Sequence, residues 1–201
     1  MQRFDDFLHL YYKMDFHPSE EKTLIAGCKK NDPLARKQLY EFYAPAMLGI
    51  CFRYTNDREK AKDVLHEGFI KVFTKINTYS EEGSLVGWMR RIFVTTALEF
   101  LRESNSLQFM DIVKYEDTIE TVEISAIEKL SAEDILKCIS ELPKGCRLIF
   151  NMFALEGYSH GEIAKMLNIK EGTSRSQFAH AKQLLQEKVQ RLYTHTDARN
   201  R

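Results

Sequence analysis

The chain has 201 residues, of which 44% are hydrophobic and 29% are charged. These values are typical of a globular protein with one or two domains. No run of about 18 apolar residues is present, so no membrane insertion is expected, and the early acidic residues predict no signal peptide. The four cysteines form no CxxC pair, so we expect reduced thiols, no metal site and a cytoplasmic protein.

Charge is unevenly distributed along the chain, although the formal net charge is zero. Residues 1–104 carry 16 basic and 15 acidic residues, residues 105–134 carry 2 and 8, and residues 135–201 carry 11 and 6. An acidic segment therefore separates a neutral block from a basic one. Such asymmetry indicates that the basic end binds a polyanion.

Helical periodicity dominates the first block, residues 1–104. An amphipathic helix is predicted within residues 1–18, and the next helix is predicted to begin near Ser19. Asp32, followed by a proline, is typical of the start of a third helix. We expect this third helix to break near Pro45, because proline in a helix interior removes a backbone hydrogen bond.

The clearest helix of the first block covers residues 57–76. Its apolar residues recur at three- and four-residue steps and form one stripe, and Asp57 is a favourable N-cap. A further helix is predicted from Ser84 to Arg102. Residues 105–130 are acidic and weakly periodic, and we interpret them as a linker.

The second block, residues 131–195, is predicted to contain four helices. The third of them, residues 159–167, begins with a capping box of the Ser-x-x-Glu type. A turn at Asn168 and a long helix over residues 171–193 follow. This order is typical of a helix-turn-helix. The predicted fold class is therefore all-α: two helical domains joined by an acidic linker, the second a four-helix domain containing a helix-turn-helix.

Two sequence blocks resemble the extracytoplasmic-function (ECF) group of bacterial sigma factors, the subunits that direct RNA polymerase to promoters. The polymerase-binding and promoter-melting helices of sigma region two resemble DREKAKDVLHEGFIKVFTKI (57–76) and GSLVGWMRRIFVTTALEFLR (83–102). Region four resembles LPKGCRLIFNMFALEGYSHGEIAKMLNIKEGTSRSQFAHAK (142–182). The resemblance covers about residues 20–104 and 131–193. It implies a protein without enzymatic activity or cofactor that binds core RNA polymerase and directs promoter-specific transcription initiation.

By this resemblance, the last helix reads the upstream (−35) promoter element as duplex DNA. A recognition helix presents its N-terminal residues to base edges in the major groove. Hydroxyl groups suit phosphates, whereas Arg and Gln can read bases. The candidate −35 contacts are Lys170, Glu171, Thr173, Ser174, Arg175, Ser176, Gln177, Ala179, His180 and Lys182. A solvated charged face is the alternative interpretation, and Phe178 is expected to belong to the core.

The resemblance also implies that region two captures the downstream (−10) element as a single strand. Aromatic stacking beside cationic groups is a way to hold unpaired bases. The candidate −10 contacts are Trp88, Arg90, Arg91, Thr95, Thr96, Glu99 and Arg102. On the residues alone, Trp88 could equally be a core residue.

Polymerase binding is assigned to the polar face of the helix over residues 57–76, with candidates Asp63, His66, Glu67 and Lys71. The residues alone are compatible with an ordinary solvated face. The resemblance implies contact with the clamp helices of the β′ subunit, docking of the second block on the β flap, and an anti-sigma factor as a possible further partner. It also implies that the linker passes through polymerase channels, with a disordered tether as the alternative.

Three other classes of function compete with this interpretation. An enzyme is not supported, because His66-Glu67 is followed by Ile70 where a zinc protease helix needs its second histidine, and no phosphate-binding glycine loop is present. A stand-alone helix-turn-helix transcriptional regulator would use only the second block. Whether DNA binding needs core polymerase distinguishes this regulator from a sigma factor. The basic final helix disfavours a protein-interaction adaptor with no DNA role.

Overall fold

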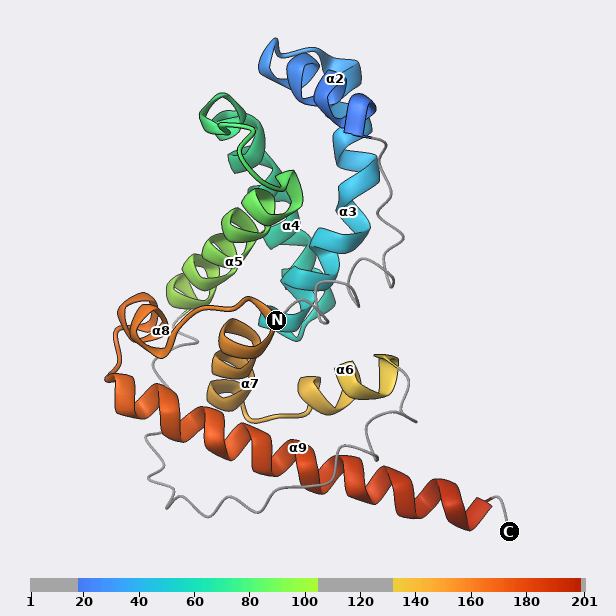
Figure 1. Ribbon diagram of the computed structural model, residues 1–201, viewed down its shortest axis with the longest axis vertical. Helices are drawn as coiled ribbons and strands as arrows, with labels where there is room; N and C mark the ends of the chain where they lie inside the picture. The colour runs from blue at the N-terminus through green and yellow to red at the C-terminus, as the bar shows by residue number, and fades with distance from the viewer. Residues whose placement is uncertain (1–17, 105–131, 200–201) are drawn as a thin grey trace. The chain divides into compact units, whose positions relative to one another are not determined.

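The computed structural model describes residues 18–104 and 132–199, and the chain divides into two compact units between residues 108 and 109 (Figure 1). Within the described ranges every regular element is helical and none is a strand, which confirms the all-α, two-domain prediction. The amphipathic helix predicted at the N-terminus and the acidic linker lie outside the described residues. None of the described helices is long and apolar enough to cross a membrane.

Three side-chain caps start the main helices of the first unit at the predicted places. Asp32 accepts hydrogen bonds from two backbone N–H groups at the start of α3, Asp57 does the same for α4, and Ser84 caps α5. Capping of this kind satisfies donors that have no partner within the helix. The elements of this unit are α2 (Pro18–Lys29), α3 (Pro33–Thr55), α4 (Arg58–Lys75), η1 (Ile76–Thr78) and α5 (Leu85–Glu103).

The predicted break at Pro45 is wrong, because α3 continues through this position to Thr55. Pro45 and Glu41 both lie on the exposed side of the helix, so water can bind the carbonyl that the proline leaves without its helical donor. Buried residues continue on the other side of α3, from Leu39 to Cys51. Tertiary packing of that side therefore holds the helix together across the proline.

The core of the first unit forms where α3, α4 and α5 pack against one another. Val64, Met89 and Phe93 are fully buried there, and burial of side chains of this size contributes about 1.5–3 kcal/mol each. Gly68 permits the close approach of α4 and α5, since a Cβ at this position would lie only 2.2 Å from the Phe93 ring.

The second unit begins with two short helices and a single π-helical segment, and ends with the helix-turn-helix. Its elements are α6 (Ala132–Ser140), α7 (Lys144–Phe150), η3 (Asn151–Leu155), α8 (His160–Leu167) and α9 (Glu171–Arg199). The capping box of Ser159 and Glu162 starts α8 as predicted, and Asn168 has the left-handed conformation expected for the turn (φ 53°). Helix α9 continues beyond its predicted end at Tyr193.

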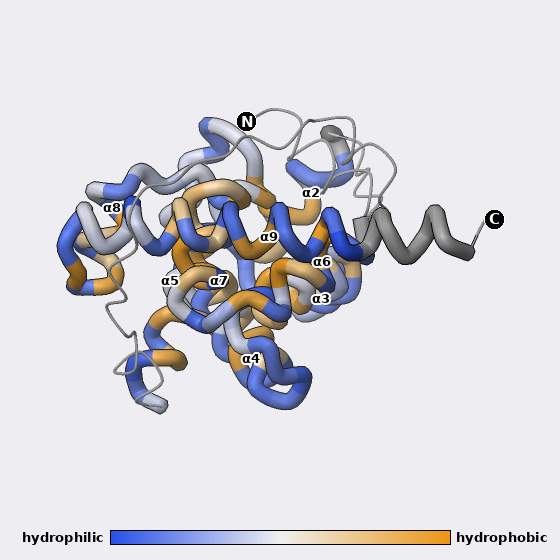
Figure 2. The backbone as a smooth tube through the Cα atoms, turned by 90° about the horizontal axis from the view of Figure 1, so that it is seen from below, coloured by the Kyte–Doolittle hydropathy of each residue, from blue (hydrophilic) through white to orange (hydrophobic). Residues whose placement is uncertain are grey.

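Apolar residues on one side of α9 close the core of the second unit. Figure 2 shows hydrophobic residues recurring along α9 between hydrophilic ones. Ala181 is buried against Leu142 and Cys146, with Leu184 and Leu185 packed beside them. This stripe leaves the opposite side of α9 exposed.

All four cysteines are free and buried, as predicted for reduced thiols. Burial raises the pKa of Cys51 to about 12 and that of Cys146 to about 11. The thiolate is the reactive form of cysteine, so these two thiols are chemically unreactive near neutral pH.

Candidate nucleic-acid interface

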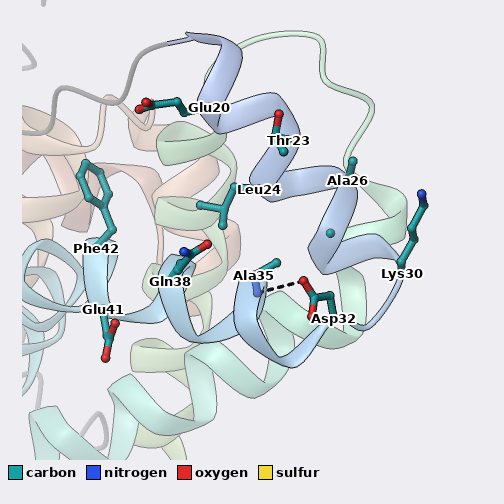
Figure 3. A pocket seen from close by; sticks show the side chains of 11 residues that line it. Glu20, Thr23, Leu24, Ala26, Lys30, Asp32, Ala35, Gln38, Glu41 and Phe42 are labelled. Atoms are coloured by element: carbon teal, nitrogen blue, oxygen red, sulfur yellow. Dashed lines mark hydrogen bonds between the residues drawn. The ribbon is translucent and has the colours of Figure 1, made fainter.

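An open groove of about 1030 Å³ between α2 and α3 contains none of the predicted site residues (Figure 3). Its lining mixes apolar residues such as Leu24 and Phe42 with carboxylates such as Glu20 and Glu41. Asp32 also lines it, and this side chain already accepts from the backbone N–H of Ala35. The candidate surfaces therefore lie elsewhere, on the exposed faces of three helices.

The start of α9 is held firmly by the turn before it. The backbone N–H of Ile169 donates to the carbonyl of Ala164, and the N–H of Ser174 donates to the carbonyl of Lys170. Lys170, Glu171 and Arg175 are exposed on this first turn of the helix. The arrangement displays charged side chains at the N-terminal end of a long helix, which is the geometry of a recognition helix.

Arg175 donates a hydrogen bond to Glu171 four residues earlier on α9. Both side chains are largely exposed, and exposed pairs of this kind contribute only about 0.3–0.5 kcal/mol. The guanidinium can therefore leave Glu171 at little cost. Thr173, Ser176, Ala179, His180 and Lys182 are half-exposed along the same helix.

The predicted DNA contacts of Ser174 and Gln177 are wrong, because both side chains face the interior. Ser174 is 0% exposed and Gln177 is 5% exposed. The hydroxyl of Ser174 lies 2.9 Å from Nδ1 of His160, and the thiol of Cys146 donates to Oε1 of Gln177 over 3.0 Å. With Ala181 these two positions form a stripe at three- and four-residue steps, a signal that the sequence already contained.

The aromatic residues at the helix-turn-helix form a cluster rather than a DNA contact. Phe178 stacks near Phe150 and lies 4.5 Å from Phe153 between ring centroids, which confirms it as a packing residue. Lys182 lies over the Phe178 ring at 5.3 Å. Burial lowers the pKa of His180, so this side chain adds no positive charge near pH 7.

The predicted −10 contacts on α5 divide into exposed and buried positions. Arg91, Thr95 and Arg102 are exposed, whereas Arg90 and Glu99 are half-buried. The predicted contact between Thr96 and DNA is wrong, because this residue is 2% exposed and its hydroxyl donates to the carbonyl of Ile92. The same helix also buries Met89, Phe93, Val94, Ala97, Leu98 and Leu101. Thr96 thus lies on the packed side of the helix.

Trp88 is half-buried at the start of α5, with its ring 5.3 Å from that of Tyr79. The Tyr79 hydroxyl donates to the carbonyl of Gly83, and Lys29 of α2 binds both the carbonyl of Tyr79 and the carboxylate of Glu81. These contacts fix the loop between η1 and α5 beside the indole. Sequence reasoning missed Lys29, because nothing near it in the chain indicates this contact.

The predicted polymerase face of α4 is largely exposed. Asp63, His66 and Glu67 all face solvent, and Ile70 beside them is 59% exposed. Ile70 was not among the candidates predicted from the sequence. Lys71 differs from the other candidates, since its Nζ lies 2.6 Å from a carboxylate oxygen of Glu99 on α5.

Comparison with known proteins matches both units to one family. The family model described as Sigma-70 region 2 matches residues 39–106, and the model described as Sigma-70, region 4 matches residues 132–185. The ECF RNA polymerase sigma-E factor of Haemophilus influenzae is 26% identical over 183 residues, covering 86% of this chain and 96% of the relative. The protein of the same name from Escherichia coli K12 is also 26% identical, with 86% and 95% covered.

Two solved structures are similar to the chain as well. The sigma factor RpoE in complex with the anti-sigma factor NepR from Bartonella quintana has a TM-score of 0.47 at 21% identity, covering 77% of this chain and 96% of that one. CnrH in complex with the cytosolic domain of CnrY has a TM-score of 0.45 at 15% identity, with 82% and 94% covered. The two family matches, region 2 followed by region 4, show that the chain belongs to the sigma-70 family, whose members direct transcription initiation, and its similarity to the sigma-E factors identifies it with the ECF group.

Proposed function

We propose that this sigma factor uses three separate surfaces during initiation. The outer side of the α9 N-terminus binds the −35 element, the exposed side of α5 binds the −10 element, and the exposed side of α4 binds core RNA polymerase. The observation that carries the proposal is the exposed charge at the N-terminal end of α9, within the matched region 4.

The −35 surface consists of side chains that point away from the core of the second unit. Lys170, Arg175 and Lys182 supply positive charge for phosphates or for guanine, which accepts two hydrogen bonds from Arg. Thr173 and Ser176 supply hydroxyls. The buried Ser174 and Gln177 are left out of this surface.

The −10 surface combines cations with a supported aromatic pair. Arg91 and Arg102 lie on the exposed side of α5, with Thr95 between them. At the start of the same helix Trp88 lies beside Tyr79. Unpaired bases stack on aromatic rings, and neighbouring Arg residues hold the phosphates. Unpaired bases are therefore captured near Trp88, and the phosphates of the DNA strand are bound along α5.

The polymerase surface has charged residues around one exposed aliphatic side chain. Asp63, His66 and Glu67 are exposed on the two turns of α4 before Ile70. An apolar contact with polar contacts at its edge is a common arrangement in protein interfaces. We assign this surface to the β′ clamp helices and propose that the second unit docks on the β flap. An anti-sigma factor that covers these surfaces is proposed on family membership alone.

A pair of variants tests the assignment of the −35 surface. Arg175→Ala is expected to weaken holoenzyme binding to the upstream duplex about tenfold or more, since loss of one bidentate base contact costs about 1–3 kcal/mol. Binding of the variant to core polymerase should not change. Lys137→Ala, on the exposed side of α6, removes the same charge and should have no effect on either.

The opposite result would reassign α9. Loss of polymerase binding and DNA binding together in Arg175→Ala would show that this helix does not serve the −35 element. DNA binding by the isolated chain that core polymerase does not improve would favour a stand-alone regulator.

A further inference from the structure

His160 occupies the point where three elements of the second unit meet. It is the first residue of α8, and the capping box of Ser159 and Glu162 fixes its backbone. Its ring stacks on Phe153 of η3, with 4.2 Å between centroids and 13° between planes. The Phe178 ring of α9 lies in an edge-type arrangement with it, with 5.8 Å between centroids. Two aromatic neighbours thus give the imidazole one orientation.

In that orientation Nδ1 of His160 lies 2.9 Å from the Ser174 hydroxyl. Ser174 belongs to the first turn of α9 and is 0% exposed, so no solvent reaches it to replace this partner. A buried polar group that loses its hydrogen bond destabilises the arrangement that buries it. The pair therefore favours one rotation of the α9 start over others.

Arg175 directly follows Ser174 and is exposed, whereas Ser174 is buried. Consecutive helical residues are separated by about 100° around the axis, so an anchor at Ser174 fixes the direction of Arg175. A second buried anchor follows three residues later, where the thiol of Cys146 donates to Gln177. These two contacts hold the packed side of α9 in place. They thereby also fix the direction of its exposed side, which is proposed to contact DNA.

We propose that His160 is a positioning residue for promoter reading. Its hydrogen bond to Ser174 sets the rotation of α9 and so aims Arg175 at the upstream duplex. The inference rests on the proposed function of α9 and adds a residue from α8 that has no direct role in that surface.

The charges around His160 support a neutral ring in this role. Burial lowers the pKa of His160, the nearby Arg175 lowers it further, and Glu171 of the same helix acts in the opposite direction. Arg175 and Glu171 also pair with each other on α9. With its proton on Nε2, the neutral imidazole accepts from the Ser174 hydroxyl at Nδ1, and with its proton on Nδ1 it donates to that hydroxyl.

Two substitutions at His160 separate the hydrogen bond from the ring. His160→Phe keeps an aromatic ring for stacking on Phe153 but has no nitrogen for Ser174. His160→Asn places an amide near the position of Nδ1 but has no ring. Each full-length variant is assembled with core polymerase, and binding is measured by fluorescence anisotropy. The two probes are a promoter fragment taken from mapped start sites and the same fragment with its upstream element shuffled.

The expected result is a change in discrimination between the two fragments. His160→Phe should lose about tenfold in preference for the native element, the effect of one misplaced hydrogen bond, while its affinity for the shuffled fragment stays the same. His160→Asn should keep most of the preference at temperatures well below its unfolding midpoint. Ser174→Ala should match His160→Phe, and the double variant should be no worse than either single variant.

Several results would overturn the inference. If His160→Phe keeps full discrimination between the two fragments, the hydrogen bond does not position α9. The same conclusion follows if His160→Asn loses this discrimination while His160→Phe keeps it. Independent, additive losses in the double variant would show the same. Arg175→Ala separates the positioning role of His160 from the proposed role of α9. If Arg175→Ala loses the preference for the native element and His160→Phe keeps it, only the role of His160 is contradicted. If both variants keep the preference, the proposed role of α9 is contradicted as well.

Discussion

Lys71 of α4 and Glu99 of α5 form an ion pair, with 2.6 Å between Nζ and Oε2. The sequence assigned the first residue to polymerase binding and the second to DNA binding. The structure joins them across two helices that also pack together through Gly68 and Phe93. The proposed polymerase surface and the proposed −10 surface are therefore built on one pair of packed helices.

Breaking this pair should destabilise the first unit modestly. Glu99→Gln removes the charge at nearly constant shape and should cost roughly 0.5–1 kcal/mol, because both side chains are partly exposed. Urea unfolding measures the change. Lys62→Met, which breaks the exposed pair of Lys62 with Glu59 within α4, is the matched control and should cost less. An equal loss of unfolding free energy in the two variants would mean that the ion pair between α4 and α5 contributes no more than the exposed pair within α4.

Gly68→Ala should destabilise the first unit strongly, since its Cβ would clash with the buried Phe93 ring. Overpacking a core in this way costs about 1–3 kcal/mol. Gly87→Ala in α5 meets nothing closer than 3.8 Å and should be neutral or stabilise by about 0.5–1 kcal/mol. Chemical unfolding of both variants checks the contrast, and equal stabilities would contradict the close helix packing.

Ile70→Ala should weaken binding to core polymerase roughly tenfold, in the range seen for side chains at the centre of an interface. Folding stability should change little, because Ile70 is already 59% exposed. Leu34→Ala is the control, as Leu34 is 62% exposed on α3 and outside the proposed surface. Affinity is measured by titrating labelled core polymerase with each variant. A larger effect at Leu34 would place the polymerase surface elsewhere.

The stability of the second unit should fall as pH decreases below about 6.5, the ordinary pKa of histidine. Burial lowers the pKa of both His160 and His180 in the folded chain. The unfolded chain then binds more protons in this range, so the stabilisation is complete above the unfolded pKa and is lost as pH falls toward the folded values. Thermal unfolding between pH 8 and pH 5 measures the slope.

Replacement of one of these histidines supplies the control for that slope. His180→Gln removes one of the two titrating groups, so the pH dependence of its unfolding midpoint should be shallower than that of the unaltered chain. His66→Gln alters an exposed histidine in the other unit and should leave the slope as it is. A midpoint of the second unit that does not vary over this pH range would refute the explanation from these two partly buried histidines.

Local sequence signals were sufficient for most of the helix starts. Asp32, Asp57 and Ser159 start helices as predicted, and Ser84 caps the helix that was predicted to begin with it, because a cap depends on residues only two or three positions away. The break at Pro45 failed for the opposite reason. Whether a proline interrupts a helix depends on what packs on both sides of it, and that packing comes from residues distant in the chain.

The candidate sites were predicted less completely than the helices. Family resemblance identified the helices that carry them, but the side that faces inward had to be assigned by periodicity. Ser174, Gln177 and Thr96 lie on helices that the resemblance assigns to DNA, although their spacing places them on the packed sides of α9 and α5. The partners of Lys29 and His160 lie on other elements, so no local pattern could indicate them.

The most direct test of the central claim, that this chain directs initiation, is transcription in vitro with purified core RNA polymerase. Promoter-length genomic fragments from the same source serve as template, and the 5′ ends of the transcripts are sequenced. The account predicts discrete start sites that appear only when the chain is added and that share upstream and downstream elements. Failure to bind core polymerase, with no start sites that depend on the chain, would contradict it.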